Sequence, residues 1–110
     1  MKARSIPFFM VVGMALPVAA LADGDFERAT EAYERSHYAE SVQLLRLAAQ
    51  VNDLRAQEML GFMHLCGAAL YGAEVPRDLD QARYWLQRAA SAGSAVATHT
   101  LQRAQFRRNP

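Results

Sequence analysis

The stretch Ala56–Gly93 decides the fold expected for this chain. It begins AQEMLGFMHLCG at residues 56–67, passes through a turn that ends VPRD at 75–78, and continues LDQARYWLQRAASAG to residue 93. Apolar residues recur at spacings of three and four in the two outer segments, whereas glycine and proline punctuate the segment between them. We therefore predict two helices joined by a turn.

Small residues indicate where these two helices touch. Gly61 lies in the middle of the first helix, where glycine lowers helix stability by about 1 kcal/mol relative to alanine. The usual compensation is another group that packs closely against the glycine. Trp85 on the second helix is the expected neighbour. Asp78 is expected to cap that helix, with Gln81 completing a capping box, and Gly93 to end it in the left-handed conformation.

The segments on either side repeat the pattern. Residues 25–36, beginning at the expected cap Asp25, and residues 38–51 have helical periodicity, as does a segment from Ala95 to about residue 107 that Ser94 would cap. The pair Ala48-Ala49 recurs as Ala89-Ala90, 41 residues later. Since no strand pattern appears, we predict an all-α solenoid of stacked α-hairpins.

The first 22 residues have the features of a secretory signal peptide. Lys2 and Arg4 precede an apolar run from residue 6 to 21, and small residues lead to a cleavage position after Ala22. The alternative is a retained anchor, but the run is shorter than a spanning helix and contains Pro17. We expect a periplasmic or secreted protein that meets a membrane only through this segment. The expected division is 1–22 signal peptide and 23–110 helical repeat domain, with hairpins 25–51 and 54–92 and a terminal helix 95–107.

The charge is nearly balanced. The chain has 12 basic and 11 acidic residues, and Lys2, its only lysine, belongs to the signal segment. Nucleic-acid binding requires a basic footprint, which only the tail with Arg103, Arg107 and Arg108 approaches. We therefore expect no nucleic-acid partner.

No residue pattern indicates catalysis or a bound cofactor. No nucleophile motif, zinc-protease motif or phosphate loop is present. His37, His64 and His99 lie in different predicted helical units, so we expect no metal site. His64 is instead expected to be packed and hydrogen-bonded between helices. The single cysteine, Cys66, is either a small buried apolar residue, or the site of an intermolecular disulfide or a reactive thiol.

The elements A-x-x-x-L-G, V-P-R-D, A-x-x-W and A-A-x-x-G together resemble a Sel-one-like repeat, a relative of the tetratricopeptide repeat. His64 stands where that family usually has tyrosine, and residues 25–51 match more loosely because Ser41 replaces an alanine. The resemblance implies a right-handed stack of α-hairpins that holds other proteins or peptides. The residues that carry it are Ala56, Leu60, Gly61, Gly67, Pro76, Asp78, Ala82, Trp85, Ala89, Ala90 and Gly93.

The resemblance also places a partner-binding groove on the first helix of each hairpin. Phe62 and Tyr33 would be apolar anchors, and Arg55 and Glu58 would orient the partner. The alternative is that Phe62 and Leu65 only pack against neighbouring hairpins. The candidate groove residues are Phe26, Tyr33, Arg55, Glu58, Phe62, Leu65, His99 and Arg103.

These observations favour a non-enzymatic protein-interaction module that binds an extended or helical segment. Because two hairpins are few for a stable array, we also expect self-association or stabilisation by a partner. The alternatives are a structural or envelope-stress protein without a dedicated groove, and a metal- or ligand-binding protein that uses His64.

Overall fold

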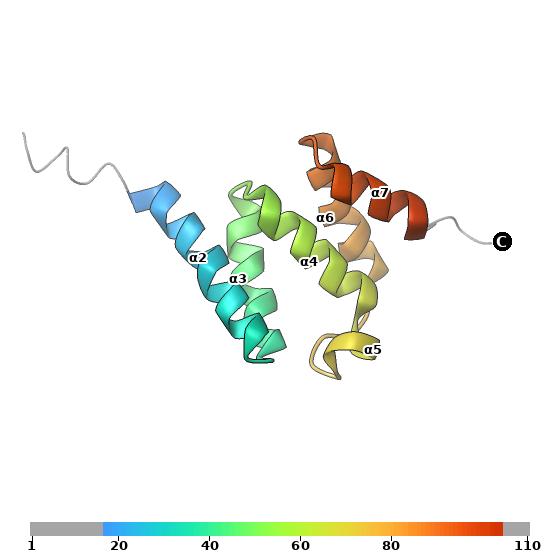
Figure 1. The fold of residues 1–110 in the computed structure, drawn as a ribbon, viewed down its shortest axis with the longest axis horizontal. Coiled ribbons are helices and arrows are strands. Elements are labelled where there is room, and N and C mark those ends of the chain that lie inside the picture. The colour runs from blue at the N-terminus through green and yellow to red at the C-terminus, as the bar shows by residue number, and fades with distance from the viewer. Residues whose placement is uncertain (1–16, 105–110) are drawn as a thin grey trace, which may run out of the picture.

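The computed structural model describes residues 17–104, which form a row of α-helical hairpins (Figure 1). The elements are α2 (Pro17–Glu34), α3 (Tyr38–Gln50), α4 (Leu54–Cys66), α5 (Ala68–Tyr71), α6 (Leu79–Ser91) and α7 (Ala95–Ala104). No strand occurs in this part of the chain. Residues 1–16 of the expected signal segment, and the end of the expected terminal helix beyond residue 104, lie outside the described residues.

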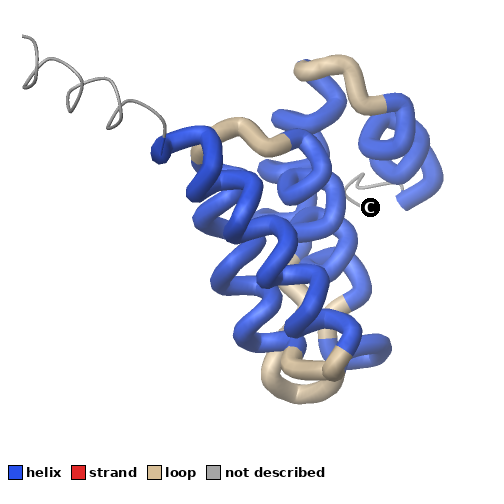
Figure 2. The backbone as a smooth tube through the Cα atoms, turned by 60° about the vertical axis from the view of Figure 1, so that its left-hand side comes forward, coloured by secondary structure: helices blue, strands red, loops and turns tan. Residues whose placement is uncertain are grey.

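The helices pair as the sequence predicts. α2 packs on α3 and α4 packs on α6, while α3 contacts α4 and α6 contacts α7 to join the units. Figures 1 and 2 show the chain moving steadily from the α2–α3 hairpin to α7, with each hairpin laid beside the last. The predicted all-α hairpin stack is confirmed.

The first helix is longer than predicted. It begins at Pro17 and not at Asp25, and it therefore runs through the predicted cleavage position after Ala22. Alanine and leucine are strong helix formers, and proline is well tolerated at a first helical position. Asp25 lies inside the helix, where its carboxylate pairs with Arg28 Nη1 at 2.8 Å and does not act as a cap.

Side chains cap α4, α6 and α7, and in the last two they are the predicted residues Asp78 and Ser94. Asp53 accepts hydrogen bonds from backbone N–H groups at the start of α4. Asp78 accepts one from the N–H of Gln81 at 3.1 Å, and Ser94 Oγ accepts one from the N–H of Ala97 at 2.9 Å. The predicted capping box is only half formed, because the Gln81 side chain accepts a hydrogen bond from Trp85 Nε1 at 3.2 Å.

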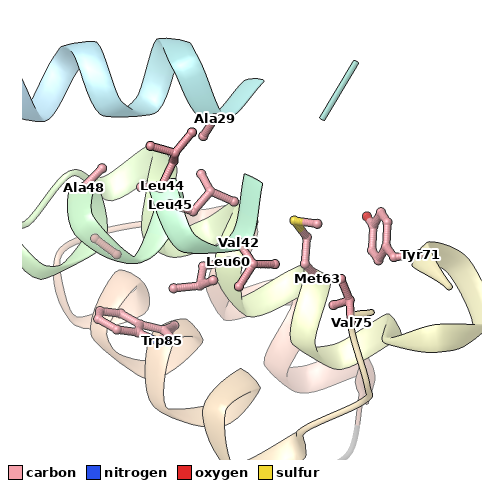
Figure 3. Close-up of a cluster of buried hydrophobic side chains, with 12 residues drawn as sticks. Ala29, Val42, Leu44, Leu45, Ala48, Leu60, Met63, Tyr71, Val75 and Trp85 are labelled. Carbon is pink, nitrogen blue, oxygen red and sulfur yellow. The ribbon is translucent and has the colours of Figure 1, made fainter. Parts of the chain in front are cut away.

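Gly61 does mark a close helix contact, but the predicted neighbour is wrong. A Cβ atom at Gly61 would lie 2.7 Å from Leu86 Cγ and 3.3 Å from the Leu86 backbone nitrogen. Consecutive residues on a helix point about 100° apart, so Leu86 and Trp85 cannot both face the glycine. Leu86 enters the notch, and Trp85 packs in the core cluster formed mainly by α3 and α4 (Figure 3).

Two clusters of buried side chains hold the stack together. A smaller cluster joins α6 to α7 through Leu86, Ala89 and Ala97. Burial of apolar side chains at both junctions is the main force that holds successive helices together. The larger cluster, drawn in Figure 3, contains Ala29, Val42, Leu44, Leu45, Ala48, Ala49, Ala56, Leu60, Met63, Tyr71, Val75 and Trp85.

Ser41 has a clear role where the repeat usually has alanine. Its side chain is fully buried between α2 and α3. Its hydroxyl donates a hydrogen bond of 2.9 Å to the carbonyl oxygen of Ala29. A buried hydroxyl is tolerated when it is hydrogen-bonded, so the serine fits the position at which only a small residue has room.

The turn between α4 and α6 contains a helical element that the sequence pattern does not predict. Gly67 ends α4 with φ 58° and ψ −146°, and α5 follows at once. Tyr71 in this turn is 5% exposed and packs against the first hairpin. The hydroxyl groups of Tyr71 and Tyr33 lie 2.9 Å apart, so the turn contacts a helix 38 residues earlier.

Candidate functional site

A shallow pocket lies between α4 and α7, and we call it the α4–α7 pocket. Four of the candidate groove residues line it, and its volume is about 370 Å³. Phe62 remains 43% exposed there, although its helix is otherwise well packed. The pocket is lined by Phe62, Leu65, His99, Thr100, Arg103 and Ala104.

Glu58 and Ser94 fix the position of α7 beside α4. Ser94 Oγ donates a short hydrogen bond to Glu58 Oε2 and accepts one from the N–H of Ala97. Ala97 itself is fully buried against α6. The predicted groove residue Glu58 is thus held by the fold, one turn from Phe62, and orients one wall of the pocket.

Phe26 and Arg55, also predicted for the groove, lie against each other. The Arg55 guanidinium carbon is 4.1 Å from the centroid of the Phe26 ring, which is a cation–π contact between α2 and α4. Arg55 also donates to Asp53 through Nε at 3.2 Å and Nη2 at 2.9 Å. Although burial raises the pKa of the Asp53 carboxyl, hydrogen bonds from Arg55 and Ala56 outweigh it and leave that pKa lowered.

Tyr33, predicted as an apolar anchor, belongs to a cluster of three tyrosines. Its ring centroid lies 5.4 Å from that of Tyr38 and 5.6 Å from that of Tyr71, in edge-to-face geometry. Tyr38 and Tyr71 are 4.9 Å apart in the same geometry. These contacts tie α2, α3 and α5 together, so Tyr33 is a packing residue away from the α4–α7 pocket.

His64 is packed as predicted, but the predicted hydrogen bond is absent. Its side chain is 8% exposed, and neither ring nitrogen has a hydrogen-bond partner among the described residues. Burial lowers the pKa of its imidazole, Arg46 lowers it further, and Asp78 opposes the shift. His64 also borders a pocket of about 310 Å³ between α3 and the segment before α6.

The folded protein is expected to lose stability as the pH falls below about 6.5, the usual pKa of an unfolded histidine. The pKa of His64 is lower in the folded protein than in the unfolded chain. As the pH falls, the unfolded chain therefore binds a proton at this histidine before the folded protein does, and the unfolded state is favoured. Urea unfolding of wild type and His64→Phe at pH 7.5 and pH 5 measures this. The variant should lose less stability over the interval than wild type. An equal loss of stability in wild type and His64→Phe would assign the pH dependence to other groups. The control variant is His99→Gln, because His99 is exposed.

Cys66 is a free, half-buried cysteine. Burial raises the pKa of its thiol, although nearby Arg77 opposes the shift. A raised pKa reduces the thiolate fraction and hence the reactivity of the sulfur. This favours the interpretation of Cys66 as a packing residue.

Within residues 17–104, no group of three or more histidine, cysteine or acidic side chains is placed to hold a metal ion. Among the helices of the same part, none has the length and apolar character that crossing a membrane requires.

Comparison with known proteins identifies the central hairpin. Residues 54–94 match the family model of the Sel1 repeat, the Sel-one-like repeat named above. No curated protein and no solved structure matches the chain. The matched residues run from the first residue of α4 to Ser94, the cap of α7, and include one wall of the α4–α7 pocket.

Proposed function

Because residues 54–94 are a Sel1 repeat, and such repeats mediate protein–protein interaction, we propose that this chain is a non-enzymatic interaction module. Its binding site in this proposal is the α4–α7 pocket, which receives a segment of a partner protein. The first helices of two successive units form the pocket walls. This is the place at which a helical stack offers a continuous surface to a ligand.

The exposed ring of Phe62 is the observation that carries the proposal. The ring is 43% exposed above a pocket that also contains Leu65 and Arg103. Aromatic and arginine side chains supply much of the energy at protein interfaces. Tyr33 and Arg55 make contacts within the fold, so the proposal relies on Phe62 and not on them.

We propose further that the module acts outside the cytoplasm, in the periplasm or beyond the cell. The support is the charged start, apolar run and small residues that precede Asp23. Expression in a bacterial host should yield a mature protein whose intact mass corresponds to residues 23–110. A mass that retains the first 22 residues would contradict export by cleavage.

Replacing Phe62 by serine is expected to abolish partner capture with little loss of stability. Phe62 is 43% exposed, and surface substitutions usually change stability by about 0.5 kcal/mol or less. Crosslinking in the native compartment, followed by mass spectrometry, would compare wild type with Phe62→Ser. Leu47→Ser is the matched control, because Leu47 on α3 is 52% exposed and does not line the pocket.

The outcome separates the proposal from its structural alternative. Loss of the same crosslinked protein in Phe62→Ser, with retention in Leu47→Ser, supports the interaction module. If Phe62→Ser lowers the melting temperature but captures the same proteins as wild type, Phe62 has only a packing role. That result would favour a structural protein without a dedicated groove.

A further inference from the structure

We propose that the α4–α7 pocket selects an acidic partner segment, in which a large apolar side chain enters the pocket beside one or more carboxylates. This inference rests on the proposed function of the pocket and adds the chemistry of its occupant. The occupant is a segment of another protein. The argument depends on which charges around the pocket already have partners within the fold.

The ionisable side chains that line the pocket are of the basic residue types, and only Arg103 is always charged. Arg103 and His99 both lie on α7, and no acidic side chain is among the lining residues. Arg103 makes no hydrogen bond or ion pair with any residue between 17 and 104. Its guanidinium therefore stands beside an apolar pocket without a partner among the described residues.

Glu58, the acidic side chain of α4, already has a hydrogen-bond partner within the fold. Glu58 accepts the hydrogen bond from Ser94 Oγ, and Ser94 in turn caps α7. Asp53 at the start of α4 is likewise bound to Arg55. Both carboxylates hold contacts that position a helix, and neither pairs with Arg103.

A second arginine lies beside the opposite wall. Arg77 donates from Nε to the carbonyl oxygen of Leu65 at 3.2 Å, and Leu65 itself lines the pocket. This bond uses one of the five N–H donors of a guanidinium. Arg77 itself lines the pocket between α3 and the segment before α6, so Arg103 is the arginine that lines the α4–α7 pocket.

An acidic segment complements this arrangement in two ways. A carboxylate can form charge-assisted hydrogen bonds to Arg103, which are about twice as strong as neutral ones. The basic rim also speeds the encounter with a negatively charged segment and slows that with a positive one. The exposed acidic residues Glu27, Glu31 and Glu34 lie on α2, which does not line the pocket.

Peptide selection with charge variants tests the proposal. A phage-displayed library of random 16-residue peptides is panned against the purified chain, and the affinity of the strongest peptides is measured by fluorescence anisotropy. We expect peptides with large apolar residues flanked by aspartate or glutamate. Arg103→Glu should weaken their binding about tenfold, and a higher ionic strength should weaken binding to wild type. Arg35→Glu should change it less than twofold, because this exposed arginine at the end of α2 is remote from the pocket.

A charge-swapped peptide provides the positive control for the variant. Replacing the acidic residues of a selected peptide by lysine should weaken its binding to wild type and strengthen its binding to Arg103→Glu. Recovery of this kind requires a folded, functional pocket, so it excludes loss of structure as the cause of the weaker binding. Equal binding of both peptides to both proteins would overturn the inference.

The remaining outcomes separate this inference from the proposed function. If the selected peptides bind through Phe62 but carry no excess of acidic residues, the pocket function stands and the acidic specificity is wrong. If no selected peptide depends on Phe62, the proposed function itself fails. A homodimer that Phe62→Ser disrupts in sedimentation would make a second copy the occupant and overturn the inference. So would stronger peptide binding after removal of residues 105–110, which would assign the pocket to the tail of the chain itself.

Discussion

Replacing Gly67 by alanine is expected to destabilise the protein by at least about 3 kcal/mol. The glycine has φ 58° and ψ −146°, a combination that residues with a Cβ atom avoid. A Cβ atom there would lie 2.4 Å from both the Cα and the nitrogen of Arg77. Because backbone atoms cannot turn aside as a side chain can, α4 and the start of α6 would have to separate.

Thermal unfolding measures this effect against a matched glycine. Gly93 also has a positive φ, 102°, but nothing lies within 4 Å of its ideal Cβ position. Gly93→Ala should therefore cost only about 1–2 kcal/mol of backbone strain. Since 1 kcal/mol corresponds to about 4–8 °C in a domain of this size, Gly67→Ala should melt at least several degrees below Gly93→Ala. Equal melting temperatures would contradict the close approach of Arg77.

Shortening Leu86 to alanine is expected to cost about 2–5 kcal/mol, the range for a buried leucine. Leu86 is 1% exposed and fills the space above Gly61. Gly61→Ala alone should destabilise the protein by about 1–3 kcal/mol through overpacking. The higher helix propensity of alanine offsets about 1 kcal/mol of this loss. In the double variant the new methyl group enters the space that Leu86 vacates. The double variant should therefore lose less stability than the sum of the two single variants.

Urea unfolding of the four proteins gives the coupling energy between the two positions. Residues in direct contact typically show coupling of about 0.5–3 kcal/mol. Gly24→Ala combined with Leu86→Ala is the control, because Gly24 has open space around its Cβ position and lies on α2. Its effects should add. Additivity in the Gly61 pair as well would mean that Leu86 does not occupy the notch.

Most of the helices, and the caps of α6 and α7, could be predicted from the sequence because they depend on neighbouring residues. Asp53, Asp78 and Ser94 each accept a backbone hydrogen bond from two or three residues ahead, and the apolar spacing that follows each of them marks a helix. The Sel1 repeat was recognisable for the same reason. Its signature combines helix caps, small contact residues and a turn within about 40 residues.

Contacts that depend on how each helix is rotated about its own axis relative to its neighbours could not be predicted in the same way. The spacing places Trp85 and Leu86 on one broad apolar face, but only the packed structure shows that Leu86 faces Gly61. The missing hydrogen bond of His64 likewise depends on the helices around it. Tyr33 meets Tyr71 across 38 residues, through a helical turn in which glycine, alanine and tyrosine give no clear periodicity.

The candidate site was predictable in part. Phe62, Leu65, His99 and Arg103 come from two helices of a repeating pattern, so equivalent positions indicated a shared surface, and all four line one pocket. Phe26 and Arg55 pair with each other, and Glu58 holds Ser94. These contacts join residues of different helices, and the pattern along one helix cannot reveal which surface side chains find partners within the fold.

The burial of Trp85 gives the protein its own optical reporter. It is the only tryptophan of the chain, it is 4% exposed, and it packs with residues of both hairpins. Its emission should be blue-shifted while the hairpins are docked and should move to longer wavelength when water reaches the indole. α7 packs on the other cluster, around Leu86 and Ala97. The fluorescence therefore distinguishes separation of the two hairpins from fraying of the last helix, without any added dye.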